Sequence, residues 1–143
     1  MADVAGCDCL RCEGSRAAAL AKGAEQSRSP WLLFLRPGAV LESSWIDETT
    51  QFMERMSASG QRRAGIFRYA RSPYEEATVR DGVRLLARLI SGPSADQGLL
   101  ISRDHYERIG GYAPQVRRAE AKLISKLGRT GRAMLRTRIF VAA

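Results

Sequence analysis

WLLFL, residues 31–35, is the segment of this 143-residue chain that decides the fold. Five apolar residues in succession, with no polar alternation, are typical of a strand that is buried on both faces. Pro37 and Gly38 end the run directly afterwards. GLLIS (98–102) has the same pattern, and AGIFRYA (64–70) resembles it. The sequence therefore predicts buried strands at the centre of the fold.

Amphipathic segments lie between these apolar runs. The clearest is the helix that Ser43 or Ser44 begins, because its apolar residues recur on one face of a 3.6-residue period. Its inward stripe is Trp45, Ile46, Thr49, Phe52, Met53 and Met56. Further helices are expected after Ser15, over 74–91, over 103–109 and over 119–128, with one or two short strands in 133–142. The alternation of strands and helices predicts an α/β class with a mainly parallel mixed sheet.

The size and composition indicate one domain, residues 1–143. Apolar residues make up 45% and charged residues 27% of the chain, which is close to the globular average and argues against wholesale disorder. No apolar run approaches the roughly 20 residues that a membrane-spanning helix needs. The amino terminus has no basic start followed by an apolar block, so it does not resemble a secretion signal. We therefore expect a cytoplasmic protein.

The positive charge is concentrated near the carboxyl terminus. The chain has a net charge of +8, and the segment Arg117 to Arg138 holds eight basic residues and one acidic residue. Such a segment is suited to a polyanion, either nucleic acid or an anionic membrane surface. A coding bias toward arginine is an alternative cause of the composition, but it does not account for the clustering. Recognised nucleic-acid motifs are lacking, and of aromatic residues only Phe140 lies near, so nucleic acid is the less favoured partner.

Cysteine and histidine do not form a recognisable metal motif. Cys7, Cys9 and Cys12 are clustered, but no fourth cysteine follows, and His105 is distant in the sequence. A structural zinc site needs four ligands, usually as two close pairs. Unligated thiols in a short strand are therefore favoured over a metal site, and His105 is expected on the surface of a short helix. The chain also lacks the glycine-rich phosphate-binding motifs of nucleotide-binding α/β folds.

Four segments in order resemble the family 2 glycosyltransferases, which transfer a sugar from a nucleoside-diphosphate donor to an acceptor hydroxyl. They are SRAAALAKGAEQSRSPWLLFL (15–35), the helix that begins SSWIDE (43–48), ADQGLLISRDHYERIGGYAP (95–114) and AEAKLISKLGRTGR (119–132). The resemblance implies the later two-thirds of a three-layer nucleotide-sugar transferase (GT-A-like) fold. The first strand–helix units of that fold have no counterpart before residue 7.

The resemblance also assigns candidate site residues. Glu120 matches the place of the carboxylate that acts as general base toward the acceptor hydroxyl, although a glutamate in the first turn of a helix is also favoured by the helix dipole. Asp96 and Gln97 match a D-Q-G triplet that either binds sugar hydroxyls or caps a turn. Gly110, Gly111 and Tyr112 match the Gly-Gly-aromatic turn near the acceptor pocket.

The metal motif of that family is missing. Its Asp-x-Asp carboxylates, which hold Mg²⁺ or Mn²⁺, are replaced after the 31–35 run by Arg36-Pro37-Gly38-Ala39, and the nearest carboxylate is Glu42. We therefore expect no metal site, and a sharper hypothesis has the Arg36 guanidinium bind the diphosphate in place of the ion.

Together these features predict a glycosyltransferase-like protein that is impaired or inactive as this chain. Its partners would be a nucleotide-sugar donor and an acceptor that is lipid-linked in many relatives, with an anionic membrane as a possible surface. The alternative is a non-catalytic basic module that binds nucleic acid or anionic membrane through Arg117–Arg138.

Overall fold

The computed structural model describes residues 6–70, 97–116 and 118–141. The helix expected over 74–91 and the candidate residue Asp96 lie outside this range. Along the chain the elements are α1 (Arg16–Gln26), β1 (Trp31–Phe34), β2 (Ala39–Leu41), α2 (Trp45–Ser59), β3 (Ala64–Ala70), β4 (Leu99–Ser102), α4 (Arg103–Arg108), α5 (Ala119–Leu127) and β5 (Arg132–Val141).

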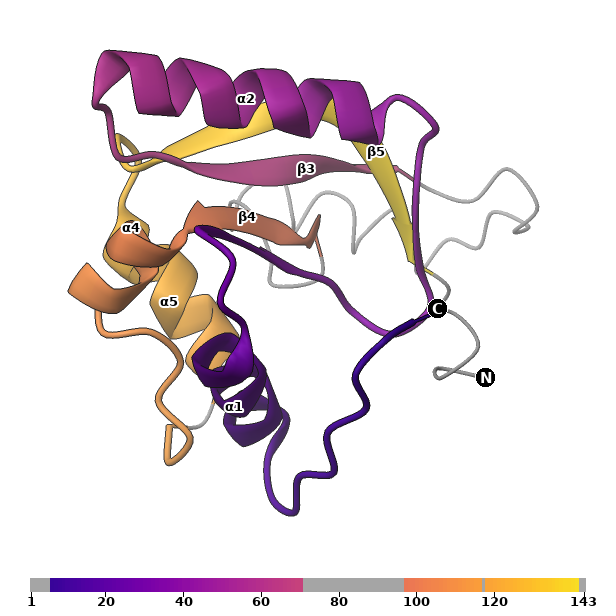
Figure 1. Ribbon diagram of the computed structural model, residues 1–143, viewed down its shortest axis with the longest axis vertical. Coiled ribbons are helices and arrows are strands. Elements are labelled where there is room, and N and C mark those ends of the chain that lie inside the picture. The colour runs from indigo at the N-terminus through magenta and orange to yellow at the C-terminus, as the bar shows by residue number, and fades with distance from the viewer. Residues whose placement is uncertain (1–5, 71–96, 117, 142–143) are drawn as a thin grey trace, which may run out of the picture.

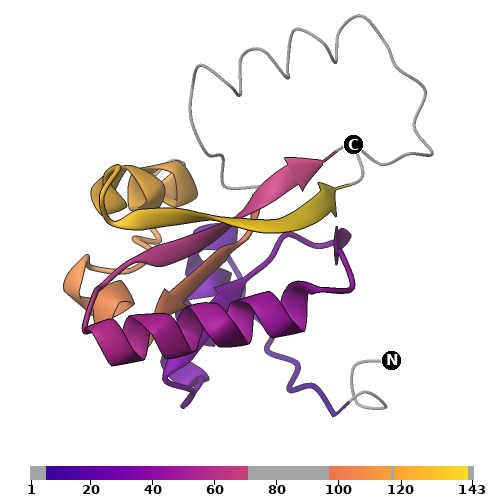
Figure 2. The ribbon, with the colours of Figure 1, turned by 90° about the horizontal axis from the view of Figure 1, so that it is seen from above.

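The strands form one mixed, mostly antiparallel sheet in the order β1-β4-β3-β5-β2. β4 runs antiparallel to both of its neighbours, with Trp31 opposite Ser102 and Gly65 opposite Leu100. β2 also runs antiparallel to β5, whereas β3 and β5 are parallel. The sheet is curled into a half-barrel, as the view from above in Figure 2 shows.

The expectation of a mainly parallel, nucleotide-sugar-transferase-like sheet is therefore wrong. Among the described strands, three of the four pairings are antiparallel. The alternation of strands and helices along the chain was the basis of that expectation. The 31–35 run was also expected to form a strand at the centre of the fold, whereas β1 is an end strand of the sheet. A continuous apolar run requires that both faces of the strand are covered, and helices can cover both faces of an antiparallel sheet as well.

Helices lie on both faces of this sheet (Figure 1): α2 on one face, and α1, α4 and α5 on the other. Successive residues of a strand point to opposite faces, so Leu99 and Ile101 join the core beneath α5, whereas Leu100 joins the core beneath α2. In the α2 core, Phe52 and Phe67 are almost completely buried. Each fully buried side chain of this size contributes roughly 1.5–3 kcal/mol by leaving water.

The α2 helix is fixed to the sheet by a carboxylate. It ends at Gly60, which has the left-handed φ of 66° that commonly stops a helix. In its first turn, Glu48 accepts hydrogen bonds from the backbone N–H groups of Arg136 and Thr137, both at 2.6 Å. These N–H groups belong to the part of β5 that β2 does not cover, so the side chain completes the pairing of that strand.

His105 is buried, with 8% of its surface exposed, which corrects the expectation of a surface residue. It lies in α4, which packs against β4, and its Nδ1 atom has no hydrogen-bond partner among the described residues. Burial lowers the pKa of His105, and the nearby Arg62 charge lowers it further while Asp104 opposes the change. The imidazole is consequently neutral near pH 7.

Within residues 6–70, 97–116 and 118–141, no helix combines the length and the apolar character that crossing a membrane requires.

Candidate functional site

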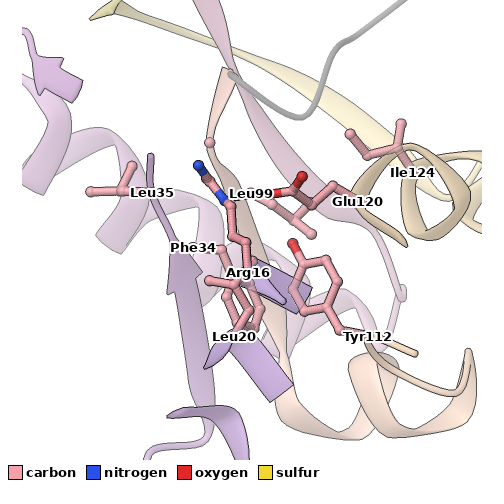
Figure 3. Close-up of a pocket in the computed structure, with 9 residues that line it drawn as sticks. Arg16, Leu20, Phe34, Leu35, Leu99, Tyr112, Glu120 and Ile124 are labelled. Carbon is pink, nitrogen blue, oxygen red and sulfur yellow. Dashed lines mark ion pairs between the residues drawn. The ribbon is translucent and has the colours of Figure 1, made fainter. Parts of the chain in front are cut away.

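A small pocket lies at the end of β1, between the first turns of α1 and α5 (Figure 3). Its free space is narrow, with room for about one water molecule. Segments that are far apart in the sequence meet there: some lining residues come before position 36, and the others come after position 97. The lining residues are Arg16, Leu20, Phe34, Leu35, Gly98, Leu99, Tyr112, Glu120 and Ile124.

An ion pair forms the polar side of the pocket. The Nε atom of Arg16 lies 2.6 Å from Oε1 of Glu120, and the two side chains are 40% and 26% exposed. Each residue stands at the start of a helix. The Ser15 hydroxyl accepts the N–H of Ala18 and donates to the carbonyl of Pro114, so it ties the start of α1 to the segment that leads into α5.

Aromatic rings form the apolar side. The ring of Phe34 packs edge-on against Tyr112, with centroids 5.0 Å apart, and tilted against Tyr106 at 5.4 Å. Burial raises the pKa of Tyr112, and the negative charge of Glu120 raises it further. The Tyr112 phenol therefore keeps its proton at neutral pH, and Figure 3 shows its oxygen directed toward Glu120.

The turn after α4 positions Tyr112. Gly111 has a φ of 55°, and a Cβ atom at this position would lie 2.8 Å from the Tyr106 ring, so only glycine fits. The Tyr106 hydroxyl accepts the N–H of Tyr112 at 3.0 Å. Gly110 also has a positive φ, and its N–H is bonded to the carbonyl of Glu107. Of the three residues of the predicted Gly-Gly-aromatic turn, only Tyr112 lines the pocket, and the glycines shape the backbone.

The structure separates two other candidates, Arg36 and Gln97, from the pocket. Arg36 is exposed in the turn before β2, where its carbonyl accepts the N–H of Ala39, and the residue that lines the pocket is Leu35. Gln97 is buried, and its Nε2 atom donates to the carbonyl of Phe67 at 3.1 Å. Gln97 thus holds the start of β4 against β3, which is a structural role.

The residues present do not fit the Mg²⁺ or Mn²⁺ that the family resemblance implies. The turn after β1 carries no carboxylate, and Glu42 is engaged by Arg138, with Oε1 and Nη2 2.6 Å apart. This pairing lowers the pKa of Glu42. In the described parts of the chain, no three histidine, cysteine, aspartate or glutamate side chains are grouped to hold a metal ion. Cys7 and Cys9 are exposed, and no strand forms over 7–12.

The basic segment is divided between two elements. Arg117 lies outside the described residues. Lys122 and Lys126 are exposed on α5, and the Lys126 ammonium donates to the carbonyl of Ile109 at 2.9 Å. Arg138 on β5 is paired with Glu42. Two of these cations are therefore held by partners within the chain.

Sequence reasoning identified Tyr112 and Glu120 of this pocket but missed Arg16 and Phe34. Arg16 follows a helix cap, and nothing in its neighbourhood distinguishes it from other exposed arginines, because its partner is 104 residues away. No known protein-family model matches the chain, and a comparison with curated proteins finds no match either.

Proposed function

We propose that this chain is a glycosyltransferase-like protein that binds a sugar-bearing ligand at the Arg16–Glu120 pocket and is impaired in transfer. The observation that carries the proposal is the convergence at one pocket of segments that resemble that family. The end of the 31–35 run, the start of the 98–102 run, the Gly-Gly-Tyr turn and the Glu120 helix all contribute lining residues.

The chemistry of the pocket supports a hydroxyl-bearing ligand. Glu120 offers carboxylate lone pairs that Arg16 does not use, and the protonated Tyr112 phenol can donate or accept. The Phe34 ring supplies an apolar wall. Because the free space is only about the size of a water molecule, one hydroxyl would enter and the rest of the ligand would lie at the mouth.

Impaired transfer follows from what surrounds the end of β1. The leaving diphosphate develops negative charge, and the turn after this strand offers no carboxylates for a divalent cation. The proposed ligands are a nucleotide-sugar donor or an acceptor of the same family, lipid-linked if the chain works at the cytoplasmic face of an anionic membrane. Glu120 is the proposed base, and Arg16 and Tyr112 are the proposed binding residues.

The test is binding, followed by turnover. The ¹⁵N-labelled protein is titrated with UDP-glucose, UDP-N-acetylglucosamine, GDP-mannose and the free sugars, up to about 10 mM because weak affinity is expected. Saturable amide shifts at Tyr112 and Glu120 are the expected result. Donor hydrolysis should remain at background with Mg²⁺ or with a chelator.

Two variants make the test specific. Glu120→Gln should weaken binding about tenfold or more, because a charged acceptor is lost. Glu107→Gln makes the same change at a 64%-exposed position of α4 and should bind as the wild type does. Absence of saturable shifts with every ligand, or equal affinity of Glu120→Gln and wild type, would contradict the proposed site. Chelator-sensitive turnover would contradict the impairment.

A further inference from the structure

Within the described residues, the outer edge of β1 presents unpaired backbone groups. β1 is an end strand of the sheet. The Arg103 N–H donates to the Pro30 carbonyl at 2.8 Å, and this bond shows which residues of β1 turn their backbone groups toward β4. In an antiparallel pair, every second residue turns its N–H and C=O groups toward the neighbouring strand. Leu32 and Phe34 therefore bond to β4, and the N–H and C=O groups of Trp31 and Leu33 point away from it. No backbone group among the described residues bonds to them.

A groove runs beside this edge. It lies between β1 and α1, encloses about 260 Å³, and is lined on the helix side by Ala19, Gly23 and Ser27. That volume is many times what a single water molecule needs. A Cβ atom built at Gly23 would have no atom within 4 Å, so the helix leaves open space here. The groove can therefore receive side chains next to the open backbone edge.

The geometry points to an extended polypeptide as the occupant, and we propose that it is an acidic segment of another protein that adds a strand to β1. Donors and acceptors on Trp31 and Leu33, two residues apart, match the repeat of a β-strand, and strand addition is an established mode of peptide recognition. Alternate side chains of the added strand would enter the groove beside Gly23.

Charge distinguishes this occupant from a second copy of the chain. If two β1 strands paired antiparallel with Trp31 opposite Leu33, Arg28 of one copy and Arg36 of the other would follow the same end of the paired strands. Like charges gathered at each end would be unfavourable, and each copy also carries a net charge of +8. Arg28 and Arg36 are both exposed, one before and one after β1. A strand with a carboxylate at each end would face these two cations favourably.

The experiment uses a fluorescein-labelled nonapeptide that alternates valine and threonine between glutamates at its two ends, because nine residues span the distance from Arg28 to Arg36. We expect saturable anisotropy with the full chain at low salt. The amide protons of Trp31 and Leu33 should exchange at least about tenfold more slowly in the complex, because they become hydrogen-bonded. A peptide with lysine at both ends should bind at least about tenfold more weakly, and the difference should shrink as salt is added.

Matched variants test the groove. Gly23→Gln places a side chain in the open space, and it should weaken binding at least about tenfold without harming α1, because glycine disfavours a helix interior. Glu25→Gln introduces the same side chain two residues later, on a different face of the helix, and should not weaken binding. A peptide N-methylated at the amides that face β1 should not bind.

Several results would overturn the proposal. The proposal is wrong if the acidic peptide does not bind, or if the N-methylated or lysine-ended peptide binds as tightly as the acidic one. It is also wrong if Gly23→Gln binds the acidic peptide with the affinity of the wild type. Concentration-dependent dimerisation that protects the Trp31 and Leu33 amides without peptide would assign the edge to a second copy instead. None of these readouts involves sugar binding, so they stand apart from the proposed function.

Discussion

Replacing Glu48 by glutamine should remove the main polar link between α2 and β5. Its Oε1 atom accepts the N–H of Arg136, and Oε2 accepts both the N–H and the hydroxyl of Thr137, at 2.6, 2.6 and 2.5 Å. Glutamine keeps one acceptor oxygen and turns an NH₂ group toward the remaining donors. Glu48→Gln therefore loses the charge and leaves at least one donor facing another donor.

The expected loss follows from these three bonds. A hydrogen bond to a charged group contributes about 1.5–3 kcal/mol. Glu48 is partly exposed, so water compensates some of the loss. We expect the free energy of unfolding to fall by about 3 kcal/mol, which is a large part of the 5–15 kcal/mol typical of a domain. Burial raises the pKa of Glu48, but the hydrogen bonds from Thr137 and Arg136 outweigh it and lower the pKa below 4.5.

This pKa shift adds a pH signature. A carboxylate with a lowered folded pKa stabilises the protein fully above its unfolded pKa near 4.5 and loses that contribution as pH falls through the folded value. The difference between wild type and Glu48→Gln should therefore shrink below pH 4.5.

Urea unfolding followed by tryptophan fluorescence measures the effect. Glu54→Gln is the matched control, because Glu54 is exposed on the same helix, and its change should stay within about 0.5 kcal/mol. If Glu48→Gln were no more destabilising than Glu54→Gln at pH 7, or if its effect were the same at pH 3.5, the carboxylate would not be stabilising β5 as argued.

Two further predictions concern α4 and its turn. Burial lowers the pKa of His105 in the folded protein below 6.5, so the unfolded chain takes up a proton at a higher pH than the folded chain does. The free energy of unfolding should therefore decline as the pH falls from 6.5 through the folded pKa, by at most about 1.4 kcal/mol per pH unit. His105→Gln should flatten urea-derived stability between pH 7 and 5, and an unchanged slope would refute this origin. Gly111→Ala should cost about 2–4 kcal/mol, because it combines a positive φ with a clash against the Tyr106 ring. Gly110→Ala, which meets only the flexible Lys126 end, should lower the melting temperature clearly less, and equal losses would contradict the clash.

Periodicity predicted the elements well where they were long. The expected helix after Ser44 and the expected strand over 64–70 correspond to α2 and β3. The apolar stripe of α2 predicted burial less well, because Ile46 belongs to the stripe and is 58% exposed. An apolar stripe predicts which face of a helix is directed toward the core. It does not predict whether the sheet extends beneath the first turn of that helix.

Strand direction and short strands were not accessible from the sequence. β2 has three residues directly after Pro37-Gly38, too few for a periodic pattern, and it exists because β5 supplies the backbone partners. Likewise, nothing in the residues of β4 states that it runs antiparallel between β1 and β3. These features depend on where distant segments pack, and apolar runs report burial alone.

The residues of the candidate site were also predicted only in part. Tyr112 and Glu120 were identified because their segments resembled a family, and the structure places both at one pocket. Gln97 was identified on the same basis, yet its amide faces the Phe67 carbonyl inside the fold. A side-chain amide serves a ligand or a backbone carbonyl equally well, so residue type does not separate the two roles.

The Arg16–Glu120 pocket and the groove beside β1 share lining residues, so a ligand at one can affect the other. Leu20 and Phe34 line both, and α1 carries Arg16 at the pocket and Gly23 at the groove. If a strand bound at the edge displaced α1, it would change the Arg16–Glu120 contact, and a ligand of that contact would by reciprocity change the affinity for the strand. A loss of sugar affinity in Gly23→Gln would thus not locate the sugar at the groove. The location of each ligand is therefore read from direct protection of backbone amides. A strand at the edge should protect the Trp31 and Leu33 amides from exchange, and a sugar at the pocket should not.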